Sequence, residues 1–451
     1  MKGDFFRDTF DAAKHFFGVR MQQGRVQLDA DWNEQAGITL HYLRSLAADL
    51  IGPHGGPGDG FKISRLPAAA EQALSDLEIA VGHYYVAGLR CENLTEVGDQ
   101  GATATYWTQR DYPVGTEAGA LPQPPFLAYL DVWERLVTVV EDPTVREPAW
   151  GGPDTGTRVQ LVWQVKALPL VVPVVGVTGE KLTGFWREFA EQALLLASPP
   201  KVRLRARAYS GDATAGSGTG PDGNAQYVGK ENQLYRVEIH TGGDSAPSFK
   251  WSRTNGSVVF PITKLHGTDV QVAFPDKLKS SLHCRDWVEV VDDDVLLGRT
   301  APLLRVQAID CSNGIVTLAG NLPVTTESPA SKHPLLRRWD GWQTVQKASA
   351  DGSESWLNLE DGIQIQFAVG GTFCAGDYWL IPARAATGDI IWPTDQSKPA
   401  GIVLNDCPRP AALPPIGVKH HFAPLSVLLP QKNGEVIPLD LRRVFKPLAA
   451  D

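Results

Sequence analysis

Apolar positions follow a helical spacing in two stretches of this chain. In the first, five apolar residues recur at alternating spacings of four and three: Ala36, Leu40, Leu43, Ala47 and Leu50. Before them, Asp31 and Glu34 form a variant capping box, in which two carboxylates satisfy free N–H groups of the first helical turn. Gly52-Pro53 then stops the chain. The pattern therefore predicts a helix that begins at Asp31 and ends before Gly52.

The apolar series of this helix has coiled-coil spacing, but it runs for only about two heptads, and a coiled coil usually needs three or four. Two interpretations stay open. The seam either packs on its own chain or meets a helix of another subunit. Ahead of the helix, Val26 and Leu28 alternate with Arg25 and Gln27, which predicts a short strand.

A second helix is predicted over residues 185–197, where it bridges two β domains. Elsewhere the alternation of polar and apolar residues is that of strands. Residues 77–93 predict two short strands around a Gly82-His83 turn. Further strands are expected at 126–140, 158–166, 202–208, 233–240, 248–252, 257–262, 287–291, 304–309, 315–318, 362–369 and 377–381. Strands at short intervals without intervening helices predict antiparallel sandwiches or barrels.

The predicted fold is therefore mainly β, with an N-terminal helical segment followed by several antiparallel β-sandwich or barrel-like domains. We divide the chain into a strand-helix docking segment at 1–60, a first β domain at 61–184, a helix and mobile linker at 185–226, and a C-terminal β region at 227–451 with one or two sandwich domains. Glycine and proline within 54–60 predict a flexible connector, and the polar run 210–224 predicts a mobile loop.

Composition narrows the function classes. The 451 residues are 43% hydrophobic and 21% charged, with a net charge of −9, which is typical of a soluble globular protein and disfavours a general nucleic-acid or anionic-membrane binder. The N-terminus lacks the basic start and apolar run of a secretory signal, and no apolar run is long enough to cross a bilayer. We therefore expect cytoplasmic synthesis without export by the general secretory route.

The cysteines and the N-terminal phenylalanines lead to two further predictions. Five scattered cysteines, an odd number without paired spacing, predict small, reduced, buried side chains.

Five phenylalanines lie in the first segment and need burial somewhere: Phe5, Phe6, Phe10, Phe16 and Phe17. A segment of 60 residues is too small to bury them alone. We therefore expect it to anchor the protein to neighbouring subunits, and its deletion to leave a folded protein that is not incorporated.

Asp131 and Glu134 are the strongest catalytic candidates, because paired carboxylates serve glycosidases as acid and nucleophile. Residues three apart on a strand face opposite sides, however, and Arg135 is available to neutralise one of them. Structural ion pairing is the favoured interpretation.

Other candidate sites have equally ordinary alternatives. Asp292-Asp-Asp294 resembles part of a calcium loop but lacks the remaining ligands, so an acidic turn is favoured. His420-His421 lacks metal-ligand spacing. Arg203, Arg205 and Arg207 line one strand face, which we interpret as solvated or acid-paired rather than as a polyanion site. Tryptophans could bind sugars, but those in strand patterns are expected to be buried. No phosphate-binding loop, dinucleotide motif or nucleophile motif occurs, and we expect no cofactor and no metal.

Several longer motifs carry a resemblance to a known family. They are Met1-Lys-Gly-Asp-Phe-Phe-Arg-Asp-Thr-Phe10, Met21-Gln-Gln-Gly-Arg-Val-Gln-Leu-Asp-Ala-Asp-Trp-Asn-Glu34, Pro124-Pro-Phe-Leu-Ala-Tyr-Leu-Asp-Val-Trp-Glu-Arg135, Gly151-Gly-Pro-Asp-Thr155, Glu231-Asn-Gln-Leu-Tyr-Arg-Val-Glu-Ile-His240, Phe249-Lys-Trp-Ser-Arg253, Gly376-Asp-Tyr-Trp-Leu-Ile-Pro-Ala-Arg384 and Arg442-Arg-Val-Phe-Lys-Pro-Leu448. In these motifs the chain resembles an uncharacterised bacterial family encoded among phage-tail-like contractile injection system genes.

The resemblance implies a non-enzymatic structural component of such a particle, at the baseplate or as a fibre or spike. A carbohydrate-binding or carbohydrate-cleaving protein, carried as cargo, is the alternative. The implied partners are other particle subunits and further copies of the chain, in a trimer, with a surface glycan as a conceivable ligand. The residues expected to dock or self-associate are Phe5, Phe6, Phe10, Trp32, Leu40, Leu43 and Leu50.

Overall fold

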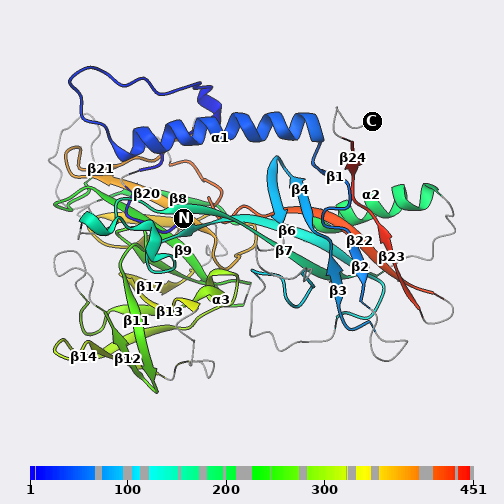
Figure 1. Cartoon of the computed structure of the whole chain (residues 1–451). Coiled ribbons are helices and arrows are strands. Elements are labelled where there is room, and N and C mark those ends of the chain that lie inside the picture. The colour runs from blue at the N-terminus through cyan, green and yellow to red at the C-terminus, as the bar shows by residue number, and fades with distance from the viewer. Residues whose placement is uncertain are drawn as a thin grey trace.

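The fold was analysed in a computed structural model of the chain. It describes residues 1–446 except 6, 67–73, 95–103, 112–120, 151–153, 172–179, 197–199, 210–225, 244, 274–281, 321, 323–331, 347–354, 396–409 and 432–434. Figure 1 shows a first β-sandwich on the right, a second on the left, a β-barrel below the second, and the helix α1 (Asp29–Ile51) along the top.

The first sandwich joins strands from both ends of the described chain. One sheet has the order β24 (Val444–Phe445), β1 (His54–Pro57), β4 (Gly82–Val86) and β5 (Leu89–Asn93). The other has the order β23 (Val436–Asp440), β22 (His421–Pro430), β6 (Phe126–Val137) and β7 (Arg158–Pro169), and β2 (Ile63–Arg65) pairs with β3 (Leu77–Ile79). Phe61, Tyr84 and Phe126 belong to one buried apolar cluster, so these sheets share a core.

The second sandwich has its own core around Tyr235, Phe249 and Trp379. Its larger sheet has the order β17 (Gly341–Thr344), β10 (Ser248–Ser252), β9 (Gln233–Thr241), β20 (Tyr378–Arg384) and β21 (Asp389–Ile390). Its smaller sheet has the order β18 (Leu357–Asn358), β19 (Ile363–Phe367) and β8 (Leu204–Ala208).

The barrel is inserted between β10 and β17, which are neighbours in the second sandwich. It closes in the order β11 (Val259–His266), β12 (Asp269–Val272), β15 (Ile315–Ala319), β14 (Leu303–Asp310), β13 (Trp287–Val291) and β16 (Leu335–Trp339). The predicted mainly β fold of antiparallel sandwich and barrel-like domains after an N-terminal helix is thus confirmed.

The predicted domain boundaries do not coincide with the sheets. Strands 421–445 return to the first sandwich, where β22 pairs with β6 along most of its length. β8 pairs with β19, so residues 204–208 belong to the second sandwich rather than to a linker. The helix α2 (Glu180–Leu196) lies along the chain between β7 of the first sandwich and β8 of the second, and packs Trp186, Ala190 and Leu194 on the first. The predicted loop 210–224 lies outside the described residues.

The N-terminal helix α1 begins two residues earlier than predicted and ends at Ile51, before Gly52. The Asp31 carboxylate accepts a hydrogen bond from the Leu28 N–H at 3.3 Å, whereas Glu34 accepts one from the Thr9 hydroxyl at 2.6 Å instead of completing the capping box. The predicted strand at residues 25–28 is absent. Val26 is 83% exposed there, so the apolar side of the alternating pattern faces no core and does not stabilise a strand.

The 77–93 region forms three strands, not two, because the tight turn falls at Ala87-Gly88 rather than at Gly82-His83. Both turn residues have positive φ, 50° and 77°, as a two-residue hairpin requires. This turn lies against α1, and a Cβ atom added to Gly88 would stand 2.1 Å from the Arg44 carbonyl oxygen. The turn therefore fixes how closely the helix approaches the sheet.

Gly88→Ala is expected to loosen α1 and destabilise the first sandwich. The positive φ alone costs about 1–3 kcal/mol, and the collision with Arg44 adds to that cost. Thermal unfolding and the rate of proteolysis within α1 measure the effect. Gly58→Ala is the matched control, because Gly58 also has a positive φ of 58° but has nothing within 4 Å of its added Cβ. Equal proteolysis of both variants would contradict the contact between Gly88 and α1.

Residues 54–57, expected to be part of a flexible connector, are instead the buried strand β1 between β24 and β4. Gly56 makes this possible, since its added Cβ would meet Tyr84 at 2.5 Å. The neighbouring His54 is buried and fully paired. The Tyr84 hydroxyl accepts a hydrogen bond from the Arg443 N–H at 3.0 Å and therefore donates its own proton to His54 Nδ1 at 2.9 Å. His54 Nε2 in turn donates to the Glu191 carboxylate at 3.2 Å.

This hydrogen-bond chain predicts a stability that falls on mild acidification. Burial, with help from nearby Arg443, lowers the pKa of His54 below its usual 6.5 despite Glu191. Below pH 6.5 the unfolded chain takes up a proton that the folded protein resists, so the free energy of unfolding falls. Urea unfolding between pH 7.5 and 5 should show this slope, and His54→Gln should flatten it. An unchanged slope in His54→Gln would show that another group is responsible.

Candidate functional site

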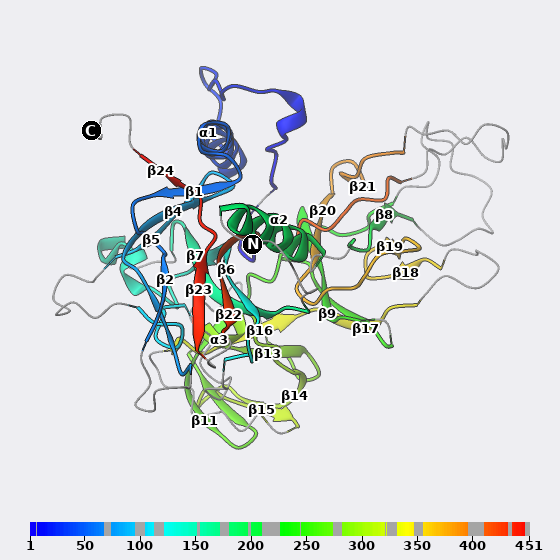
Figure 2. The ribbon, with the colours of Figure 1, turned by 90° about the vertical axis from the view of Figure 1, so that its right-hand side faces the viewer.

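The helix α1 is the most prominent surface element of the molecule. Figure 2 views it nearly end-on, standing at the edge of the fold. One side of the helix is held by the body of the protein: Ala30 and Ile38 are buried, and the Arg44 guanidinium makes two hydrogen bonds to Glu134 of β6, at 3.0 and 2.6 Å. The helix is thus a fixed part of the fold.

A second side of α1 is covered by the chain that precedes it. The Gln35 amide oxygen accepts from the Val19 N–H at 2.8 Å, and the ring of Phe17 contacts that of Tyr42 at 5.2 Å between centroids. Phe10 lies against Gly37 and His41, on the side of the helix that faces the body. The segment of residues 9–19 therefore contacts α1 between Glu34 and Tyr42.

The third side of α1, which we call the apolar face, is left uncovered. It consists of Trp32, Ala36, Leu40, Leu43, Leu46, Ala47 and Leu50. At 3.6 residues per turn these positions form a stripe about 120° wide. Leu40, Leu43 and Leu46 are 44%, 58% and 58% exposed, and Leu50 and Trp32 are 78% and 69% exposed. A stripe of this width normally faces a core, yet here it faces solvent.

The predicted docking residues divide into three groups. Trp32, Leu40, Leu43 and Leu50 lie together on the apolar face, so packing of the seam on its own chain is wrong. Phe10 and Phe5 are half-buried and pack within the chain, and Phe6 lies outside the described residues.

Leu46 is not among the predicted docking residues, although it lies beside the heptad positions and within the width of the stripe. Phe16 and Phe17, predicted to be buried, are 53% and 80% exposed. Both enlarge the uncovered apolar surface near α1.

The first five residues form a strap across the junction between the second sandwich and the barrel. The Asn255 amide donates to the Gly3 carbonyl at 3.0 Å, and Arg236 donates to the Met1 carbonyl at 3.2 Å. The Lys2 ammonium lies 3.1 Å from the Glu238 carboxylate. The strap is therefore held by both its backbone and its side chains.

Below the strap, buried charged groups from three strands form one network. Glu238 of β9 accepts from Arg236 at 2.7 Å and lies 3.4 Å from the Lys250 ammonium. Lys250 of β10 donates to both oxygens of Glu289 on β13, at 2.7 and 2.8 Å, and Glu289 also accepts from the Trp339 indole at 3.1 Å. Burial alone would raise the pKa of Glu238, but Lys2, Arg236 and Lys250 hold it well below its usual 4.5.

This arrangement corrects the expectation that residues 1–60 can be deleted without unfolding the protein. The strap completes a buried ion network, and β1 lies in the interior of a sheet. A truncation would remove counter-charges and a central strand together. The segment is therefore part of the fold, and its uncovered apolar surface, on α1 and around Phe16 and Phe17, remains available for docking.

The carboxylates of Asp131 and Glu134 do not converge. Asp131 is buried and accepts from Lys166 at 2.6 Å, with His420 at 2.7 Å, whereas Glu134 pairs with α1 as described. Arg135, expected to neutralise one of them, instead pairs with Glu141. Both carboxylates thus have structural partners.

The acidic run 292–294 begins the short helix α3 (Asp293–Leu296). Asp292 caps that helix and pairs with Arg299 at 2.8 Å, and Asp294 pairs with Lys332 at 2.7 Å. Across the part of the chain that the structure describes, no group of three or more His, Cys, Asp or Glu side chains is placed to hold a metal ion.

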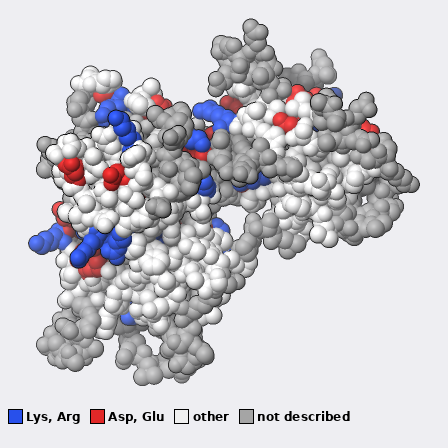
Figure 3. All heavy atoms as spheres, turned by 90° about the horizontal axis from the view of Figure 1, so that it is seen from below, with Lys and Arg blue, Asp and Glu red and all other residues white. Residues whose placement is uncertain are grey.

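On the predicted arginine face, Arg203 is exposed, as a solvated face requires, whereas Arg205 and Arg207 of β8 are half-buried. Arg205 donates to Gln366 at 3.2 Å, Arg207 donates to Gln364 at 2.8 Å, and Arg207 also lies over the Trp356 ring at 4.0 Å. On the face opposite α1, the described basic side chains lie in small groups beside acidic ones (Figure 3).

The cysteines are less uniform than expected. Cys91 is buried, and burial raises the pKa of its thiol to about 12, but Cys284 and Cys311 are exposed. Cys407 lies outside the described residues. Among tryptophans whose burial is described, only Trp32 is exposed. Of the four strand tryptophans expected to be buried, Trp133, Trp251 and Trp379 are buried and Trp163 is half-buried.

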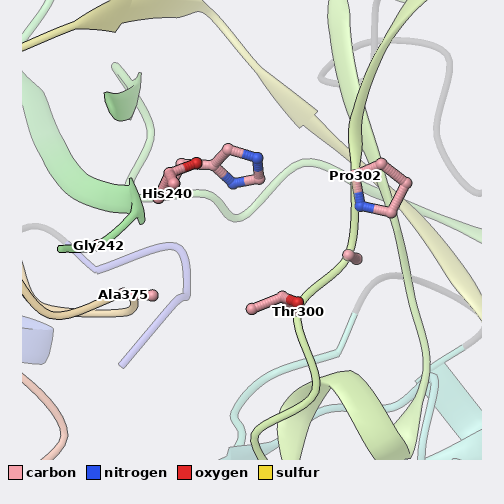
Figure 4. A pocket seen from close by; sticks show the side chains of 7 residues that line it. His240, Gly242, Thr300, Pro302 and Ala375 are labelled. Carbon is pink, nitrogen blue, oxygen red and sulfur yellow. The ribbon is translucent and has the colours of Figure 1, made fainter. Parts of the chain in front are cut away.

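A cavity of about 520 Å³ lies where the end of β9 meets residues 300–302 and Ala375. Figure 4 shows the His240 ring pointing into it, toward Pro302, with Thr300 below. Burial, and then nearby Lys250, lower the pKa of His240. The lining residues include no carboxylate and no cysteine. Among the residues that line this cavity, His240 therefore has no carboxylate partner.

No helix among the described residues is both long and apolar enough to cross a membrane. The model of one protein family matches residues 1–171 and 221–433, which include α1, most of both sandwiches and the barrel. No curated protein and no solved structure matches the chain. The matched residues make up most of the sequence, and the chain therefore belongs to the family of unknown function DUF6519.

Proposed function

We propose that this protein is a non-enzymatic structural component of a phage-tail-like contractile injection particle, placed at the baseplate or in a fibre or spike. In this proposal it is made in the cytoplasm and then built into the particle. Its partners are other particle subunits and further copies of itself, in a trimer. The motifs that resemble proteins of such systems support the proposal, and so does the surface of α1.

The observation that carries the proposal is the uncovered apolar face. Nearly half of the exposed large apolar side chains in the described part of the chain lie within residues 16–50, and the others are scattered. Concentrated apolar surface of this kind marks a protein interface. A rigid helix that presents such a surface, on a body of two sandwiches and a barrel, fits a subunit that is fixed in an assembly.

The charged groups fit a structural role as well. The candidate catalytic carboxylates are engaged in ion pairs, and the cavity beside His240 has no acid to pair with the imidazole. A carbohydrate-directed function has no specific observation in its favour, since the strand tryptophans are not exposed.

Sedimentation of particles from the producing cell tests the proposal. The chain should sediment with the contractile sheath protein in a constant ratio that survives washing in high salt. If the particles sediment while the chain stays in the soluble fraction, the proposal is wrong.

The isosteres Asp131→Asn and Glu134→Gln are expected to leave function intact, because both carboxylates serve the fold. Each change should cost at most a few kcal/mol of stability through a stranded basic partner, and incorporation into particles should persist at moderate temperature. The assay exposes wild-type and variant proteins to bacterial polysaccharides and peptidoglycan and looks for new reducing or unsaturated ends. Cleavage by the wild type that disappears in either isostere, while the melting temperature holds, would establish an enzyme instead.

A further inference from the structure

What covers the apolar face can be inferred from its spacing and polarity. Five of its residues, together with Asn33 at its edge, fall into two heptad-spaced series, Asn33-Leu40-Ala47 and Ala36-Leu43-Leu50. This is the a and d pattern by which helices pack side by side. From Asn33 to Leu50 the stripe carries no charged side chain, and its polar ones are Asn33 and Thr39, so it fits a largely apolar helical partner.

Asn33 identifies that partner more closely. It is exposed at the start of the first heptad series, at a position equivalent to Leu40 and Ala47. An amide at such a position would lose its hydrogen bonds against an apolar surface. Against the same residue of a parallel copy, it can form amide-to-amide hydrogen bonds that set the register. A second copy of this chain, parallel and in register, can therefore supply the hydrogen bonds that the Asn33 amide needs when the apolar face is covered.

The width of the stripe sets the number of copies. A two-helix seam buries mainly the a and d positions, so Trp32 and Leu46, which flank them, would stay exposed in a dimer. A third helix covers that flank. The buried residues Ala30 and Ile38, which face the body, lie on roughly the opposite side of α1. The bodies of three copies would therefore lie on the outside of a central helix bundle.

We propose that the apolar faces of three copies pack together as a parallel, in-register bundle of α1 helices, with the Asn33 side chains at one level. The inference deepens the proposed function, because it names the partner of its docking face. In this arrangement each α1 contacts the α1 helices of the other two copies, so the ring of three closes.

The test uses the purified full chain, without particles. Light scattering coupled to size exclusion should give the mass of three chains, and a mass of one or two chains would overturn the proposal. Orientation is tested by oxidising Asn33→Cys in a background with Cys284→Ser and Cys311→Ser. A parallel, in-register bundle should give disulfide-linked dimers within each trimer.

Asp49→Cys in the same background is the matched control. Asp49 is equally exposed but lies about 100° or more from the centre of the stripe, so it should not cross-link. Leu43→Cys provides a second position on the stripe, where cross-linking should match that of Asn33→Cys. Cross-linking of Asn33→Cys that is no greater than that of Asp49→Cys would overturn the parallel register.

These outcomes are separable from the particle assignment. If the chain is a trimer but never enters particles, the bundle is supported and the proposed function is wrong. If the chain is a monomer that enters particles through α1, the bundle is wrong and the proposed function is supported.

Discussion

Replacing Glu238 with Gln is expected to lower the free energy of unfolding by about 3–5 kcal/mol, the usual cost of stranding buried charges. For a cooperative unit of 150–250 residues this corresponds to a fall in Tm of roughly 6–20 °C. Glutamine keeps the volume of the side chain but removes the anion that Lys2, Arg236 and Lys250 share. Arg236 and Lys250 are each 3% exposed, so water cannot replace the lost charge.

Calorimetry is the appropriate measurement, because a chain with several cores need not unfold in one step. The transition that contains the second sandwich and the barrel should move, while that of the first sandwich should stay. Glu188→Gln, at an exposed position of α2, is the matched control and should leave every transition in place. If Glu238→Gln melted like this control, the buried network would contribute nothing that the fold requires.

The double variant Leu40→Glu and Leu43→Glu is expected to lose both self-association and incorporation into particles. Burying one leucine is worth about 1.5–3 kcal/mol, so losing two weakens an interface by roughly 100- to 10,000-fold. Unpaired carboxylates in an apolar seam add a desolvation cost. Both leucines are exposed in the single chain, so the monomeric variant should keep the secondary structure of the wild type.

The control for this variant is Val369→Glu and Ile391→Glu. These residues are 84% and 50% exposed and lie on the second sandwich side, away from α1. They add the same charge without touching the apolar face, so association and incorporation should match those of the wild type. Equal loss in both double variants would mean that added charge, not the apolar face, was responsible.

Much of the strand content could be predicted because polar and apolar residues alternate along the strands, as in residues 126–140, 158–166, 233–240 and 248–252. In β9 and β10 the alternating charged residues are themselves buried, so the pattern there marks a buried ion network rather than a solvated face. β22 escaped detection since Pro424 interrupts its pattern, and the structure accommodates that proline beside a register shift between Pro424 and Ser426. The sequence did not predict β1, because its glycines, which allow close approach of the backbone, give no apolar pattern.

The return of residues 421–445 to the first sandwich could not be predicted, because pairing between distant segments leaves no local mark. The docking helix could be predicted in part. Its seam was visible as a spacing of three and four, but the same spacing fits packing on the own chain. Ala30 and Ile38 distinguish the two interpretations, because they are buried against the body on the opposite side of the helix and leave the seam exposed.

The strap and its ion network left no signal either. Lys2, Glu238 and Glu289 are far apart in the sequence and belong to no motif of known chemistry. Only the folded sheets bring them together, at the junction between the second sandwich and the barrel.

A reconstruction of purified particles by electron cryo-microscopy, compared with particles from cells that lack this chain, tests the central claim most directly. We expect density for two sandwiches and a barrel per copy at the baseplate or on an attached fibre or spike, present only in particles with the chain, and with the apolar face of α1 buried in a contact. Identical reconstructions from both kinds of cell, or attached copies whose apolar faces all point to solvent, would contradict it.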